Sequence, residues 1–202
     1  ISWTIEEALK SSLLNEVFIS TDCRKVIEIG NSYGIKPSFV RPKELSEDDS
    51  SHIDVIIHSI NWMNENKIYP DYIMLLQPTS PLRLVKDIDE SIELALNKSA
   101  DSVVSISIPS VHPYQMKEMN NNGEIYDFID KPKGYLPRQN FPSIFYTNGA
   151  IYLTKTDVIL KQKTLFPKNT IGYEMPLERS IDIDNEFDFF VCNQILKNNV
   201  SL

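Results

Sequence analysis

Two aspartates near the C-terminal end, Asp182 and Asp184, are the side chains best suited to hold a metal ion. They alternate with Ile181 and Ile183 in an extended segment, so both carboxylates face one side while both isoleucines face the core. Neighbouring carboxylates repel each other, and a divalent cation relieves that repulsion. Oxygen ligands at this spacing suit Mg²⁺ held together with substrate phosphates. The alternative interpretation is that Asp184 caps the following helix and Asp182 is a solvated neighbour.

Polar residues at the ends of expected strands form a second group of candidates. Residues 77–83, Gln-Pro-Thr-Ser-Pro-Leu-Arg, combine two prolines that fix the backbone with polar groups that can face a ligand. A rigid turn without a ligand is the alternative. Asn148 and Gly149 place an amide and a flexible backbone before an apolar strand. Arg138 can bind an anion through two parallel hydrogen bonds or lie solvated on the surface.

The elements that must position these residues alternate between helix and strand. Hydrophobic periodicity predicts strands at residues 16–20, 35–40, 71–76 and 102–108, separated by helices with apolar stripes at residues 26–33, 53–63 and 88–96. The chain also begins in a helical pattern, for which Ser2 is the expected N-cap, and one of residues 48–50 is expected to cap the helix at residues 53–63. Residues 72–76 are apolar without alternation, which is typical of a strand covered on both faces. The pattern predicts an α/β fold with a mainly parallel sheet. Ligands bind beyond the carboxyl ends of such strands, where Asp22, residues 77–83 and residues 180–184 fall.

The alternating helix and strand pattern is interrupted between residues 109 and 147. Four prolines follow Pro109 there, and residues 120–123, Asn-Asn-Asn-Gly, predict a hairpin turn. This stretch therefore reads as a small β-rich insertion. The α/β pattern resumes with a strand at residues 149–153, a helix at 156–162, a strand at 172–175 and a last helix at 185–197.

Composition limits the function classes. The chain has 202 residues with 20 Lys and Arg against 28 Asp and Glu, a net charge of −8, and no cationic run, so nucleic acid is not the expected partner. Its apolar runs fall far short of the roughly 18 residues of a membrane span. Two isolated cysteines and the absence of a signal peptide predict a cytoplasmic protein. The six glycines form no phosphate-cradling loop.

Several of these segments, in order along nearly the whole chain, resemble the CMP-sialic acid synthetases, cytidylyltransferases that act on nine-carbon nonulosonic acids. The matching segments are residues 20–22, 41–42 with 44–45, 75–83, 101–105, 112–113, 138–139, 148–152 and 179–184. The resemblance implies one domain, residues 1–202, with a three-layer αβα fold similar to nucleotide-diphospho-sugar transferases. It also implies that the insertion at residues 109–147 helps to form a homodimer or a higher oligomer.

The reaction that the resemblance implies joins CTP to the sugar acid and releases pyrophosphate. The anomeric hydroxyl attacks the α-phosphate, and Mg²⁺ offsets charge on the phosphates. By resemblance, Asp182 and Asp184 hold the metal, and one of them helps to remove the hydroxyl proton. The sequence does not choose among N-acetylneuraminate, legionaminate and pseudaminate.

The resemblance also assigns the binding residues. Those expected to contact the sugar acid are Gln77, Arg138, Asn148, Tyr152 and Phe166. Phe166 would reach the pocket of the neighbouring subunit, with core packing as the alternative. Those expected to contact the nucleotide are Asp22, Arg41, Ser50 and Ser51.

One departure from the family concerns the nucleotide loop. The family opens with a Gly-rich loop that carries Arg and Lys and wraps the triphosphate, and this sequence begins at Ile1, just after the corresponding place. We therefore expect the 202-residue chain alone to turn over poorly. Two alternatives remain at this point: a cytidylyltransferase for the eight-carbon acid Kdo, against which the segment at Gln77 argues, and a non-catalytic relative that binds ligand without the loop.

Overall fold

The structure is a computed structural model that describes residues 1–35, 39–47, 49–131 and 137–198. Its first three helices are α1 (Ser2–Lys10), α2 (Arg24–Ser32) and α3 (His52–Glu65). Helices α4 (Val85–Lys98), α5 (Thr156–Gln162) and α6 (Glu186–Lys197) follow. Each corresponds to a helix expected from the sequence. No helix in the described ranges is long and apolar enough to cross a membrane.

The main sheet has the strand order β1-β5-β2-β6. These strands are β1 (Tyr72–Leu75), β2 (Ser102–Ser107), β5 (Tyr146–Lys155) and β6 (Thr170–Glu174). Strands β2 and β6 pair in parallel, whereas β5 lies antiparallel between β1 and β2. The sheet is therefore mixed, and three of its four strands run in one direction. The sequence predicts a mainly parallel sheet, and β1, β2 and β6 do run in the same direction. Strand β5, however, pairs antiparallel with both of its neighbours.

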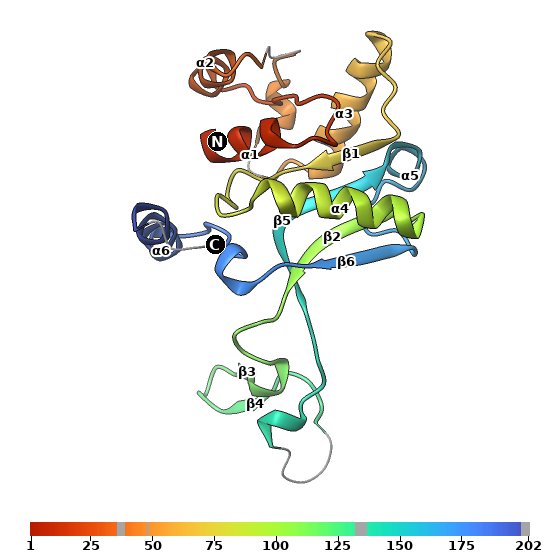
Figure 1. Ribbon diagram of the computed structural model, residues 1–202. Coiled ribbons are helices and arrows are strands. Elements are labelled where there is room, and N and C mark those ends of the chain that lie inside the picture. Colours follow the sequence, from red (N-terminus) through yellow and green to blue (C-terminus); the bar gives the residue numbers. More distant parts are fainter. Residues whose placement is uncertain (36–38, 48, 132–136, 199–202) are drawn as a thin grey trace.

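Helices cover both faces of this sheet and make a three-layer molecule (Figure 1). Ile73 and Leu75 of β1 pack into a cluster with residues of α3 and α5, while Met74 packs into a cluster that contains Ile88 of α4. Successive side chains of a strand point to opposite faces, so a strand between two helical layers is apolar at every position. The unbroken apolar run at residues 72–76 follows from this arrangement.

The N-terminal region differs from expectation. Residues 16–20 and the described part of residues 35–40 form no strand, and their place is taken by one isolated parallel bridge between Thr21 and Val40. Residues 36–38 lie outside the described ranges. A strand is stabilised by a continuous ladder, and a single bridge does not supply one. Ile19 and Ile35 are nevertheless buried together with Ile5 of α1.

Two helix starts also differ by one or more residues. Ile1, not Ser2, occupies the cap position of α1, and Ser51 occupies that of α3, where residues 48–50 were expected. Asp48 lies outside the described residues. Neither cap residue makes a side-chain hydrogen bond to the helix, so packing of the apolar faces determines where these helices begin.

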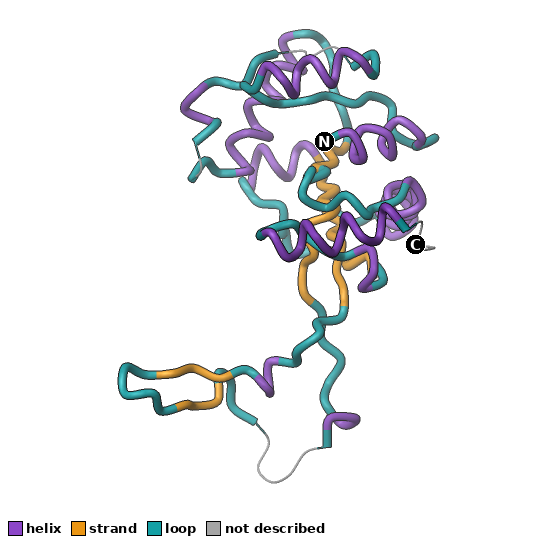
Figure 2. The backbone as a smooth tube through the Cα atoms, turned by 90° about the vertical axis from the view of Figure 1, so that its left-hand side faces the viewer, coloured by secondary structure: helices purple, strands orange, loops and turns teal. Residues whose placement is uncertain are grey.

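Between β2 and β5 the chain leaves the sheet and forms an arm, residues 109–145 without 132–136, that extends away from the body (Figures 1 and 2). It carries the expected hairpin of β3 (Lys117–Met119) and β4 (Ile125–Asp127). Gly123 takes the left-handed conformation that the turn requires, with φ +82°. Met119 and Ile125 form a cross-strand pair on this hairpin and are 72% and 63% exposed.

Candidate active site

Two side chains expected at the site converge on the backbone of Gly149. A Cβ atom built on Gly149 would lie 2.7 Å from Asp182 Oδ2 and 2.8 Å from Gln77 Oε1. Gly149 also has φ +76°, a conformation that favours glycine. The missing side chain therefore makes room for a carboxylate and an amide oxygen at the edge of the sheet where β1 ends and β5 begins.

Asp182 is the most distinctive group of this site. Its Oδ1 atom is buried and has no hydrogen-bond partner in the described part of the chain. A buried carboxylate oxygen without a partner is costly, which makes it suited to a cation or a ligand donor. Burial, followed by the negative charge of Asp182, raises the pKa values of Tyr146 and Tyr152. Both phenols therefore remain protonated donors at neutral pH.

Asp184 lies further out and is exposed to solvent. Its backbone N–H donates to Asp188 Oδ2 at 3.2 Å. The cap of α6 is Asn185, whose Oδ1 accepts from the backbone N–H groups of Phe187 and Asp188. The alternative in which Asp184 caps the helix is therefore wrong. Within the described ranges, no three His, Cys, Asp or Glu side chains form a metal-binding group, so a metal here would rely on these two carboxylates and on ligands from outside.

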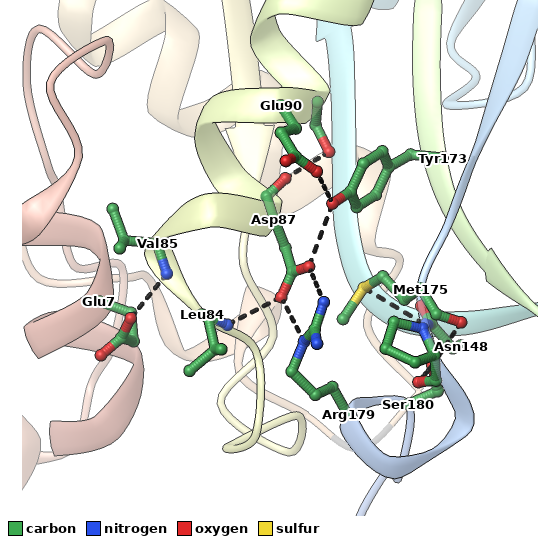
Figure 3. Close-up of polar contacts among 12 residues, drawn as sticks. Glu7, Leu84, Val85, Asp87, Glu90, Asn148, Tyr173, Met175, Arg179 and Ser180 are labelled. Atoms are coloured by element: carbon green, nitrogen blue, oxygen red, sulfur yellow. Dashed lines mark hydrogen bonds and ion pairs between the residues drawn. The ribbon is translucent and has the colours of Figure 1, made fainter. Parts of the chain in front are cut away.

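A buried ion pair holds the segment that carries Asp182 (Figure 3). Arg179 donates to Asp87 through Nη2 at 2.6 Å and through Nε at 3.0 Å. Asp87 also accepts from the Leu84 N–H at 2.9 Å and lies 3.1 Å from the Tyr173 hydroxyl, whose proton it shares with Glu90 Oε2 at 2.7 Å. The Asp87 hydrogen bonds raise the pKa of Arg179. The sequence patterns assign no role to Asp87, although an aspartate beside Ile88 on the buried face of a helix is a usable signal.

Asn148 anchors the next residue of the same segment. Its amide nitrogen donates to Ser180 Oγ at 2.9 Å, and its amide oxygen accepts from Ser105 Oγ at 2.6 Å and from the Ala150 N–H at 3.2 Å. With 2% exposure, the side chain is directed to protein groups. The expected contact between Asn148 and the sugar acid stays a prediction. The hydrogen bonds of Asn148 to protein groups support a role in positioning Ser180.

Arg83 stabilises the turn that follows β1. Its Nη1 atom donates to Ala150 O at 2.5 Å and to Gln77 O at 3.4 Å, while Nε and Nη2 have no partner among the described residues. Burial lowers the pKa of Arg83 to about 10, which leaves it cationic at neutral pH. Residues 77–83 therefore form a rigid turn, which was the alternative to a ligand-binding segment. The same turn also places Gln77 at the site.

The two aromatic candidates lie next to each other. Tyr152 and Phe166 meet edge to face, with ring centroids 6.0 Å apart. Tyr152 is half-buried, whereas Phe166 is 54% exposed, so core packing does not account for Phe166. Its expected contact with a neighbouring subunit stays a prediction.

Arg138 belongs to the arm and lines a cleft of about 430 Å³ together with residues 107–110 and 174–177. Met175 belongs to this lining and accepts a hydrogen bond through sulfur from Asn148. The cleft is thus adjacent to the hydrogen-bond network around Ser180.

The four expected nucleotide residues lie in the N-terminal part. The Arg41 N–H donates to Thr21 O at 3.1 Å, which places Arg41 beside Asp22. Arg41 Nε is buried and unpartnered in the described ranges. Ser50 Oγ donates to Glu44 O at 3.4 Å, and Ser51 precedes α3. No hydrogen bond between described residues links these four to Asp182.

A mixed sheet covered on both faces, with polar side chains at one edge, is a three-layer α/β fold. The solved structure of CMP:2-keto-3-deoxy-manno-octonic acid synthetase with CTP matches 99% of this chain and 88% of that chain with a TM-score of 0.69. At 16% identity, this match shows the fold alone. The family model described as "Cytidylyltransferase" matches residues 1–195. The chain therefore belongs to the cytidylyltransferase family.

Curated relatives differ in the acid that their names give. N-acylneuraminate cytidylyltransferase of Streptococcus agalactiae serotype V is 32% identical over 92% of this chain, which spans 44% of that relative's length. CMP-N,N'-diacetyllegionaminic acid synthase of Legionella pneumophila is 28% identical over 98% of the chain and 85% of the relative. Pseudaminic acid cytidylyltransferase of Campylobacter jejuni is 30% identical over 98% of the chain and 85% of the relative.

The close approach at Gly149 gives a testable prediction. Gly149→Ala adds a methyl group where Asp182 and Gln77 already lie, and it strains the backbone by about 1–2 kcal/mol. Gly34→Ala is the matched control, because Gly34 has φ +79° but nothing within 4 Å of an added Cβ. Urea unfolding should show a larger loss of stability for Gly149→Ala. Equal losses for the two variants would contradict the close approach.

Proposed function

We propose that the protein joins CTP to a nine-carbon, sialic-acid-like sugar acid and yields the CMP-sugar and pyrophosphate. The observation that carries this proposal is the buried Oδ1 of Asp182, which lies beside Gln77 and Gly149 and has no hydrogen-bond partner among the described residues. Membership of the cytidylyltransferase family and the names of the relatives support it. The names of the relatives give three different nine-carbon acids, so the proposal names this class of acid and not one member of it.

Asp182 and Asp184 are the residues proposed to hold Mg²⁺. The unpaired oxygen of Asp182 fits a hard cation, and an exposed Asp184 is free to complete the pair with substrate and water oxygens. When bound there, Mg²⁺ would offset negative charge on the phosphates of CTP. As the anomeric oxygen bonds to the α-phosphorus, the bond to the bridging oxygen breaks and pyrophosphate leaves with that electron pair. One of the two carboxylates accepts the hydroxyl proton.

The sugar acid would lie between the Gln77 turn and the cleft at Arg138. The Gln77 amide can hydrogen-bond its hydroxyl or acyl groups, and the Arg138 guanidinium can pair with a carboxylate. Tyr152 offers a protonated hydroxyl and Phe166 an exposed apolar face. Asn148 supports this pocket indirectly, because its amide donates a hydrogen bond to Ser180 Oγ.

The nucleotide is assigned to the N-terminal part of the molecule. Arg41 has a buried Nε without a partner in the described part of the chain, a donor suited to an acceptor on the base or a phosphate. Asp22 lies beside it and can accept from a ribose hydroxyl or an amino group. Ser50 and Ser51 supply small hydroxyls at the start of α3.

We further propose that the protein acts in the cytoplasm as a homodimer formed through the arm. The hairpin exposes Met119 and Ile125 as an adjacent apolar pair, which is costly on a protein that stays monomeric. A closed, two-fold contact between two arms would cover both copies of this pair.

The arm gives a prediction about assembly. Met119→Ser combined with Ile125→Ser should convert the dimer to a monomer at micromolar concentration, as measured by light scattering after size-exclusion chromatography. Leu96→Ser is the control, because Leu96 is 60% exposed on α4, outside the arm. A wild-type protein with the mass of a monomer, or a double variant that stays dimeric, would contradict the arm as the interface.

The reaction is tested by release of pyrophosphate. The complete protein that the gene encodes is given CTP and Mg²⁺ with N-acetylneuraminate, legionaminate, pseudaminate or Kdo in separate assays. We expect release with at least one nine-carbon acid, none after chelation of the metal, and a fall of about 100-fold in kcat for Asp182→Asn. Asp157→Asn, an exposed carboxylate on α5, serves as the control.

Three results would contradict the proposal. Release with Kdo alone would replace the nine-carbon class by an eight-carbon acid. No release with any acid would favour a protein that binds its ligand without turnover. Full activity of Asp182→Asn would remove Asp182 from the metal site.

A further inference from the structure

We propose that Asp87 and Arg179 are positioning residues that set the place of Asp182 relative to Gln77. This inference rests on the proposed function, since it concerns how the same site is held. Asp87 is fully buried and Arg179 is 6% exposed, so neither side chain is available to a substrate. Their effect on the reaction must therefore act through the segment that follows Arg179.

Three contacts fix that segment on both sides of Asp182. Arg179 is held by Asp87, Ser180 is held by Asn148, and the Ile183 N–H donates to Thr79 O at 2.9 Å. Asp182 lies between the second and third of these contacts. A segment tied at both ends leaves its central side chain little freedom, which explains how Asp182 keeps an oxygen buried without a partner.

Two of these contacts lead back to the stretch that carries Gln77. Thr79 lies in the turn after β1, and Asp87 lies in the first turn of α4, where it accepts the Leu84 N–H. The buried Arg83 side chain stabilises the same stretch, because it donates hydrogen bonds to Gln77 O and Ala150 O. The backbone between Gln77 and Asp87 is thus one rigid unit, and the ion pair joins the Asp182 segment to it.

The chemistry of the pair makes it suited to positioning. A bidentate contact between a guanidinium and a carboxylate fixes orientation as well as distance. Among the described residues, the Asp87 carboxylate has four hydrogen-bond contacts, two of them with groups other than Arg179. Removing one charge leaves the other buried and unpaired, so the local structure must rearrange. Arg179 and Asp182 are three residues apart, so such a rearrangement reaches the site directly.

Amide hydrogen exchange tests the coupling without any reaction. In the complete protein encoded by the gene, Asp87→Asn should speed exchange of the peptide containing Ile183 by at least about 10-fold relative to peptides of β2. Tyr173→Phe is the matched control. It removes one hydrogen bond to Asp87 but leaves the ion pair in place, so exchange at Ile183 should change by less than about threefold.

Steady-state kinetics then tests the consequence for the site. Below the unfolding temperature of each variant, Asp87→Asn should lower kcat by at least about 10-fold and raise the half-saturating Mg²⁺ concentration, with little change in KM for CTP. Arg179→Lys keeps the charge but not the bidentate contact, and it should give an intermediate loss. This milder variant also decides the question if Asp87→Asn does not fold.

The inference would be overturned if these variants lower only the unfolding temperature and leave Ile183 exchange, kcat and the Mg²⁺ dependence unchanged. If the wild-type protein turns over no acid, the proposed function fails. The exchange measurement still decides whether the ion pair positions the segment.

Discussion

The structure depends on one buried interaction, the bidentate ion pair between Asp87 and Arg179. Burying two charges is expensive, and the pair alone rarely repays that cost. Here the Leu84 amide and the Tyr173 hydroxyl complete the hydrogen bonding of Asp87. The pair connects residues 92 positions apart in the sequence and fixes the start of α4 against the segment before α6. Its main contribution is therefore a defined geometry at the edge of the sheet.

That geometry explains why the site can hold an unsatisfied carboxylate. Gly149 has no side chain, so Asp182 and Gln77 approach its backbone closely, and Arg83 fixes the backbone on both sides of this contact. Asn148, Ser180 and Nη1 of Arg83 are directed to other protein groups, whereas the buried Oδ1 of Asp182 has no partner among the described residues and is left for a ligand from outside. The groups that hold the site together are thus distinct from the oxygen proposed to bind the metal.

Much of this arrangement could be predicted from the sequence, because it depends on local signals. Apolar periodicity predicts helices α1 to α6 and the Asn-Asn-Asn-Gly turn predicts the hairpin, and the structure has both. The alternation at residues 181–184 singles out Asp182 and Asp184, whose binding of a metal stays a prediction. Strand pairing depends on residues distant in sequence, so the antiparallel position of β5 and the isolated bridge at Thr21 could not be read from it. The role of Asp87 was missed for the same reason, since its partner lies in a different element.

The most direct test of the account is a crystal structure of the complete protein with CTP and Mn²⁺, in which anomalous scattering locates the metal. The account predicts a metal peak about 2 Å from Asp182 Oδ1, next to the phosphates and close to Gln77, with the Asp87–Arg179 pair intact. A metal bound elsewhere, with Asp182 Oδ1 paired to a protein donor, would contradict the account.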